Sequence, residues 1–170
     1  MKTKIFFLSI ILLLVPANVF AQSRDASAAV KEFYGFHLKN QDVLNAPEIS
    51  RRRRFFTPRL GRLFDAELKR QTAYSKKYPD EKPYFEGLSF TPIELCAKDY
   101  SVEKAETSGQ KATVKVNFVY SKSSCDANDG TKIFYTISLQ KIGGKWLIDD
   151  VTYDNGETLS QAFEKAKQQK

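Results

Sequence analysis

Apolar residues in the first half of the chain recur at spacings of three and four, a pattern typical of amphipathic helices. Residues 25–40 form one such stretch with a single broad apolar face. A second helix is predicted to begin at Thr57-Pro58, because threonine caps helix N-termini and proline suits the first helical position. That helix ends before Pro79. Residues 41–48, which follow the first helix, are predicted to form a loop.

From residue 100 onward the period becomes two, which is typical of strands with one buried face. One strand is predicted around residues 100–107 and another over residues 112–120. Residues 132–142 and 145–153 flank the pair Gly143-Gly144, and two strands around such a pair predict a β-hairpin.

The order of the elements predicts the fold class. Thr158 and Gln161 have the spacing of a capping box and open a short last helix. Helices that precede an antiparallel meander of about four strands indicate an α+β domain with its helices packed on one face of the sheet. Residues 22–170 are enough for a single domain with its own hydrophobic core.

Residues 1–21 have the three parts of a cleavable secretory signal peptide. Lys2 and Lys4 precede an apolar run over residues 5–15, and Val19-Phe20-Ala21 places small residues before a cut at 21–22. As a helix this run rises about 16 Å, about half of a bilayer core, so no stable membrane span is expected after cleavage. An uncleaved anchor or a buried helix is the alternative. We expect an exported protein, periplasmic or secreted.

Charge and cysteine content narrow the function classes. The chain carries a net charge of +7, and removal of Lys2 and Lys4 leaves +5. This moderate surplus favours weak attraction to anionic surfaces, and no nucleic-acid partner is expected. In an oxidising compartment Cys96 and Cys125 are expected to form one disulfide, worth about 3–4 kcal/mol in the chain-entropy model. Two separate buried thiols are the alternative.

The second half of the chain carries the features of a known family. They are the alternating strand over residues 112–120, the hairpin around Gly143-Gly144, and the ending Trp146-x-Ile148-x-Asp150-Val151-x-Tyr153, followed by Gly156, Glu157 and Leu159. With these features the chain resembles the small exported bacterial family DUF 3828, whose middle part is similar to residues 55–60 and 96–99. The strand ending is also similar to the wider nuclear-transport-factor-2-like and SnoaL-like group.

The resemblance implies a cone-like fold in which a curved sheet holds the N-terminal helices in its concave face, with a pocket between them. It implies no activity, because this fold hosts both enzymes and non-catalytic binding modules. The family carries no catalytic motif that transfers to residues of this chain.

Two adjacent carboxylates, Asp149 and Asp150, are weak catalytic candidates. Neighbouring strand residues point to opposite faces, so Asp150 is expected to share a face with Ile148, and Asp149 with Val151. A carboxylate in an apolar pocket can serve as a general base. The alternative is a structural role, in which an aspartate accepts hydrogen bonds from a helix N-terminus or pairs with an arginine.

His37, the only histidine of the chain, is the third weak catalytic candidate. It falls on or beside the apolar face of the first helix, and the implied cone fold places it beside the pocket with Tyr34, Tyr135 and Trp146. A His–Asp pair for proton transfer is one interpretation, and a packing residue is the other. One histidine without a thiolate cluster argues against a zinc site, and no metal or other cofactor is expected.

The run Arg51-Arg52-Arg53-Arg54 is the sharpest local charge feature. Guanidinium groups bind anionic partners such as lipid headgroups or an acidic protein surface. The alternative is a solvated helix edge whose arginines pair with acidic side chains of the chain itself.

These features favour a non-catalytic ligand- or protein-binding module of the cell envelope. A small pocket enzyme of the isomerase or dehydratase kind is one alternative, and a basic surface module for anionic polymers is another. Whether the chain is an enzyme stays open. The partner also stays open between a second copy, through the open sheet face, and a different protein.

Overall fold

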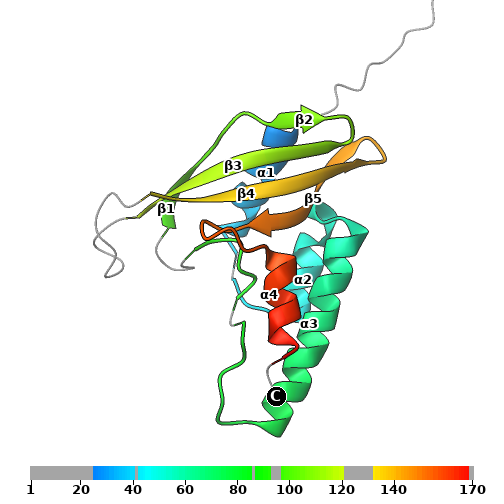
Figure 1. The fold of residues 1–170 in the computed structure, drawn as a ribbon, viewed down its shortest axis with the longest axis vertical. Coiled ribbons are helices and arrows are strands. Elements are labelled where there is room, and N and C mark those ends of the chain that lie inside the picture. The colour runs from blue at the N-terminus through cyan, green and yellow to red at the C-terminus, as the bar shows by residue number, and fades with distance from the viewer. Residues whose placement is uncertain (1–24, 41, 86, 93–96, 121–131, 169–170) are drawn as a thin grey trace, which may run out of the picture.

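The computed structural model describes residues 25–40, 42–85, 87–92, 97–120 and 132–168. It confirms the predicted α+β class, with helices packed on an open antiparallel sheet of five strands (Figure 1). The helices are α1 (Ala26–His37), α2 (Ala46–Arg52), the short 3-10 helix η1 (Arg53–Phe55), α3 (Pro58–Lys77) and α4 (Leu159–Ala166). The strands are β1 (Ala97–Val102), β2 (Glu106–Ser108), β3 (Lys111–Tyr120), β4 (Lys132–Ile142) and β5 (Lys145–Thr152).

The sheet has five strands rather than about four, because the strand expected around residues 100–107 is divided. The order is β1-β3-β4-β5, and β2 also pairs with β3. Val102 of β1 lies opposite Val116, whereas Glu106 of β2 lies opposite Thr113. Between β1 and β2 the N–H of Ala105 donates to the Ser27 hydroxyl of α1 at 2.7 Å. A backbone donor that bonds to a helix side chain is not available to the ladder, so the strand is interrupted there.

Alternation along β3 and β4 determines which face of the sheet α1 covers. The inward-facing residues are buried: Ala112, Val114, Val116 and Phe118 of β3, with Tyr135, Ile137 and Leu139 of β4. The register places Val116 opposite Tyr135 and Val114 opposite Ile137. Figure 1 shows α1 against the sheet, whereas α2, α3 and α4 gather at the β5 side. Within the described residues, no helix covers the opposite face of the sheet.

Aromatic rings fill the space between α1 and the sheet. The ring centroid of Phe33 lies 4.7 Å from that of Phe90, and Tyr34 lies 5.5 Å from Phe118. Phe118 packs edge-on against Tyr135 at 5.4 Å. Edge-to-face pairs of this kind contribute about 0.5–1.5 kcal/mol beyond the area that they bury. Around Tyr34 and Tyr135 the interior is therefore packed with side chains.

Helix α2 begins inside the segment predicted to be a loop, so that prediction holds for residues 42–45 and is wrong for residues 46–48. The side chain of Asn45 caps the helix by accepting the N–H of Glu48 at 2.9 Å. Pro47 lies in the first turn, where a missing backbone N–H breaks no intrahelical hydrogen bond. The proline that suggested a loop instead marks the start of a helix.

Two tyrosines of the interior have raised pKa values. Tyr34 is fully buried, and its hydroxyl donates to the carbonyl oxygen of Phe90 at 2.9 Å. Burial raises the pKa of Tyr34 well above its ordinary value of 10.0. Burial likewise raises the pKa of Tyr153, which follows β5. Both side chains therefore stay protonated in the folded protein at a pH where the unfolded chain ionises.

We expect the two tyrosines to stabilise the fold fully below about pH 10 and to lose that contribution above it, because only the unfolded chain then releases their protons. In Tyr34→Phe the free energy of unfolding should decline less steeply above about pH 10, and it should be about 1 kcal/mol lower near neutral pH because a hydrogen bond is lost. Urea unfolding between neutral pH and a pH above about 10 measures the slope and the loss at neutral pH.

Tyr84→Phe, at an exposed position, is the control and should keep the wild-type slope. Equal slopes in both variants would contradict the prediction.

Candidate functional site

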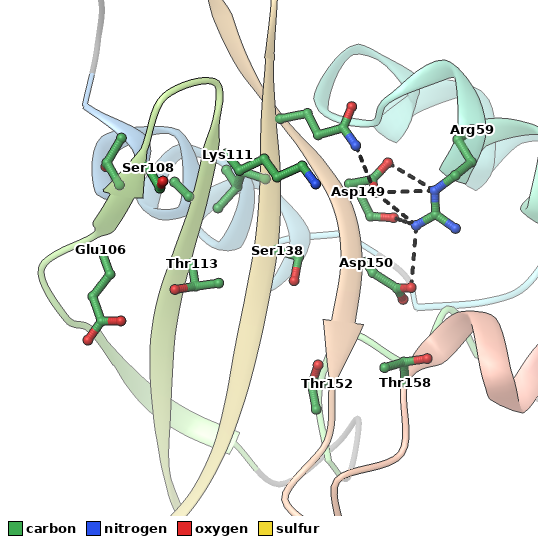
Figure 2. Close-up of a pocket in the computed structure, with 14 residues that line it drawn as sticks. Arg59, Glu106, Ser108, Lys111, Thr113, Ser138, Asp149, Asp150, Thr152 and Thr158 are labelled. Atoms are coloured by element: carbon green, nitrogen blue, oxygen red, sulfur yellow. Dashed lines mark hydrogen bonds and ion pairs between the residues drawn. The ribbon is translucent and has the colours of Figure 1, made fainter.

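A polar concavity of about 510 Å³ opens on the face of the sheet that points away from α1 (Figure 2). Strands β2 to β5 form its floor, and the N-terminal ends of α3 and α4 border it on the β5 side. Its volume is in the range of small-molecule sites, about 300–1,000 Å³. Charged and hydroxyl-bearing side chains dominate its lining, among them Arg59, Glu106, Lys111, Thr113, Ser138, Gln140, Asp149, Asp150, Thr152 and Thr158.

Four polar residues form a row across the strands on this face. Glu106 of β2 lies opposite Thr113 of β3, and Thr113 lies opposite Ser138 of β4. Ser138 in turn lies opposite Asp150 of β5. Because directly opposed residues project to the same side of a sheet, the four side chains line the concavity together.

A β-bulge in β5 brings Asp149 and Asp150 to the same region, which corrects the prediction that they point to opposite faces. Leu139 pairs with Ile148 but Ser138 pairs with Asp150, so Asp149 is an extra residue in the ladder. As a result Ile148 and Val151 are both buried, although regular alternation would place them on different faces. Both carboxylates line the concavity instead.

Asp149 is held by the start of α3. Its Oδ1 accepts the hydroxyl of Thr57 at 2.7 Å and the Nε of Arg59 at 3.1 Å. The hydroxyl of Thr57 also caps α3 by accepting the N–H of Leu60 at 3.2 Å. Gln140 of β4 donates to Oδ2 at 3.3 Å. The hydrogen bond to Asp149 is the largest cause that raises the pKa of Arg59.

Asp150 is held by the start of α4. Its Oδ1 accepts the N–H of Ser160 at 3.2 Å, and its Oδ2 accepts the Ser160 hydroxyl at 2.5 Å. Nη2 of Arg59 lies 3.3 Å from Oδ2 and so joins the two aspartates (Figure 2). Both carboxylates thus have the contacts of a structural role, hydrogen bonds from helix starts and an arginine partner.

The other residues predicted to line a pocket do not line this concavity. Tyr34 and Tyr135 belong to the aromatic core. Trp146 is partly buried against that core, and the Nζ of Lys141 lies 5.6 Å from its ring centroid. His37 is also buried, with its ring stacked on Phe33 at 5.3 Å.

His37 belongs to a buried polar network that ties α1 to α2. Its Nδ1 accepts the Nε–H of Arg52 at 2.9 Å, and its Nε2 lies 3.4 Å from Oδ2 of Asp42. Because Nδ1 accepts a hydrogen bond, the ring proton is assigned to Nε2. Nη1 of Arg52 donates to Glu48 at 2.5 Å, one turn earlier in α2. This histidine therefore joins an ionic cluster in the interior and has no access to the concavity.

The four arginines considered as a site for an anionic partner have four different environments. Arg52 is 0% exposed, so for this residue the expected surface role is wrong. Arg51 pairs with Glu48 at 2.9 Å, and Arg53 pairs with Asp65 of α3. The guanidinium of Arg54 lies over the rings of Phe36 and Phe55 at 4.9 and 4.7 Å. The run is not one continuous basic surface.

The predicted disulfide lies outside the described residues, because neither Cys96 nor Cys125 belongs to them. Within the described ranges, no group of three or more His, Cys, Asp or Glu side chains is placed to hold a metal ion. Of the helices in those ranges, none has both the length and the apolar character needed to cross a membrane.

The sequence did not single out the hydroxyl and charged residues of the concavity. Thr113, Ser138 and Thr152 occupy outward strand positions, where small polar residues are unremarkable. The available signal was the cross-strand row of polar side chains, which becomes visible only once the register of four strands is known.

Comparison with known proteins adds no family to this description. No family model matches the chain, and a search of curated proteins found no match.

The contacts of Asp150 predict a structural penalty when they are removed. Asp150→Ala should lower the free energy of unfolding by about 2 kcal/mol, because the N–H and hydroxyl of Ser160 lose a charged acceptor. Glu106→Ala, in the same concavity but without a protein partner among the described residues, should change it by less than about 0.5 kcal/mol. Urea unfolding compares the two variants, and equal losses would contradict the helix-anchoring role.

Arg52 and Arg54 should differ sharply in their effect on stability. Arg52→Met removes the guanidinium that donates to buried Glu48 and His37 and should lower the free energy of unfolding by about 3 kcal/mol. Arg54→Met removes only an exposed cation–π contact and should lower it by about 0.5–1 kcal/mol. Chemical denaturation of both variants measures the difference. A small effect at Arg52 would contradict the buried network.

Proposed function

We propose that this protein is an exported, non-catalytic ligand-binding module of the cell envelope, and that the polar concavity is its site. One observation carries the proposal. Of the described residues that line the concavity, Lys111, Thr113, Ser138 and Thr152 have side chains with no protein hydrogen bond or ion pair. In a small-molecule site a few such polar groups fix the orientation of the ligand and supply its specificity.

The contacts of the candidate acids and bases support a non-catalytic role. A general base needs a free lone pair within hydrogen-bond reach of the substrate. Asp149 and Asp150 have their oxygens occupied by Thr57, Arg59 and Ser160. His37 is 1% exposed and bonded to Arg52, which keeps it away from any ligand of the concavity.

Export is supported by the signal-peptide pattern of residues 1–21. We also propose kinship with the DUF 3828 family and, more widely, with the nuclear-transport-factor-2-like group, in which the sheet curves around the helices as a cone. The support for kinship is the strand pattern that ends in Trp146-x-Ile148-x-Asp150-Val151-x-Tyr153, together with the α+β arrangement.

Native mass spectrometry of the protein from the envelope fraction of a bacterial host tests this proposal. We expect a chain that begins at Gln22, lighter by two hydrogens because Cys96 and Cys125 are joined, and partly complexed with a small molecule that unfolding releases. Ser138→Trp should fill the concavity and abolish the complex.

Thr72→Trp is the matched control for this experiment, because it adds the same ring at an exposed position of α3 outside the concavity. It should keep the complex. Equal occupancy in Ser138→Trp and the wild type would contradict the proposed site. A chain that retains residues 1–21 would contradict export.

A further inference from the structure

We infer that the ligand of the concavity is uncharged and rich in hydroxyl groups, a sugar or sugar alcohol of small size. This inference rests on the proposed function, because it names the chemistry of the same site. Three observations carry it: the distribution of charge, the row of free hydroxyls, and the absence of aromatic rings from the lining.

The concavity carries charges of both signs close together. Arg59 and Lys111 are positive, whereas Glu106, Asp149 and Asp150 are negative. Recognition of a charged ligand depends on a field of one sign, which this lining does not supply. An anion near Lys111 would be repelled by the aspartates, and a cation near Glu106 would enter a site that also holds two basic side chains. A neutral ligand incurs neither repulsion.

Hydroxyl groups occupy the middle of the concavity. Thr113 and Ser138 lie opposite each other on β3 and β4, and Thr152 follows on β5 (Figure 2). Their hydroxyls have no protein partner in the described parts of the chain. A hydroxyl donates one hydrogen bond and accepts two, and every hydroxyl of a sugar does the same. Each hydroxyl of the concavity can therefore exchange hydrogen bonds with a hydroxyl of the sugar.

Charged groups at the rim extend this match. The Nε and Nη2 of Arg59 are bonded to Asp149 and Asp150, so its guanidinium is held in a set orientation at the rim. Lys111 extends across β4 toward Asp149, whereas Glu106 stands at the opposite side (Figure 2). The concavity thus has hydrogen-bond donors at one side and an acceptor at the other. This arrangement suits a ligand whose hydroxyl groups both donate and accept hydrogen bonds. Groups fixed beforehand lose little entropy on binding.

Among the described residues that line the concavity, none is aromatic. Flat heteroaromatic ligands such as nucleobases depend on ring stacking for much of their affinity, about 1–3 kcal/mol per base. The floor instead presents strand backbone and short side chains. An aliphatic ring with polar substituents can be bound by hydrogen bonds to these short side chains and fits a hollow of about 510 Å³.

A binding experiment by NMR tests the ligand class. The exported protein is titrated with a set of neutral disaccharides (maltose, cellobiose and diacetylchitobiose), with citrate as the anion and spermidine as the cation, at equal ionic strength. We expect a neutral disaccharide to shift the backbone amide signals of Thr113, Ser138 and Thr152 in a saturable way. Citrate and spermidine should leave these signals unchanged.

Two isosteric variants show whether the hydroxyls make the contact. Thr113→Val removes a hydroxyl of the concavity and should weaken the disaccharide affinity about three- to tenfold, as expected for one lost hydrogen bond. Thr136→Val, at a neighbouring position of β4 outside the lining, should leave the affinity unchanged. Equal affinities in the two variants would overturn the inference.

The failures of the two proposals are distinguishable. Saturable shifts at the concavity caused only by citrate or spermidine would overturn the neutral ligand class and keep the concavity as a ligand site. The absence of shifts with every probe, together with no bound molecule in native mass spectrometry, would overturn both proposals.

Discussion

The β-bulge at Asp149 is the constraint on which the rest of this structure depends. Ile148 and Val151 are both needed in the core, yet a spacing of three sends two strand residues to opposite faces. One extra residue resolves the conflict, because it restores the inward direction at Val151. The same insertion turns Asp150 out of the interior, to the side on which Asp149 already lies. A packing requirement on two aliphatic residues thereby decides where two charges lie.

The displaced carboxylates then organise the helices around the β5 edge. Helix N-termini present unpaired N–H groups and partial positive charge, so a carboxylate beside them is stabilising. Thr57 uses one hydroxyl to cap α3 and to donate to Asp149, and its backbone N–H donates to the carbonyl oxygen of Ile148 at 2.8 Å. This last contact continues the bridge between Phe56 and Ile148 and covers an otherwise open strand edge. The wall of the concavity is therefore part of the fold itself.

Sequence patterns predicted the elements whose signals are local. The alternation of β3, the hairpin around Gly143-Gly144 and the capping box of Thr158 and Gln161 were found because each signal lies within a few residues. The start of α2 was missed because a proline near an asparagine marks helix starts and loops alike. The concavity was missed because its residues come from four strands and two helices, and their neighbourhood depends on a register shift that alternation alone does not show.

Adjacency in the sequence has opposite consequences in the arginine run and in the aspartate pair. Arg51 and Arg52 end α2, and Arg53 and Arg54 belong to η1. An α-helix turns about 100° per residue and a 3-10 helix about 120°, so four consecutive side chains are distributed around the axis and one of them points inward. Arg52 is that residue, which is why Glu48 and His37 are buried with it. A regular strand would separate Asp149 from Asp150, yet the bulge unites them at one arginine. A cluster of like charges in a sequence is therefore evidence for a charged surface only after the local backbone period has been established.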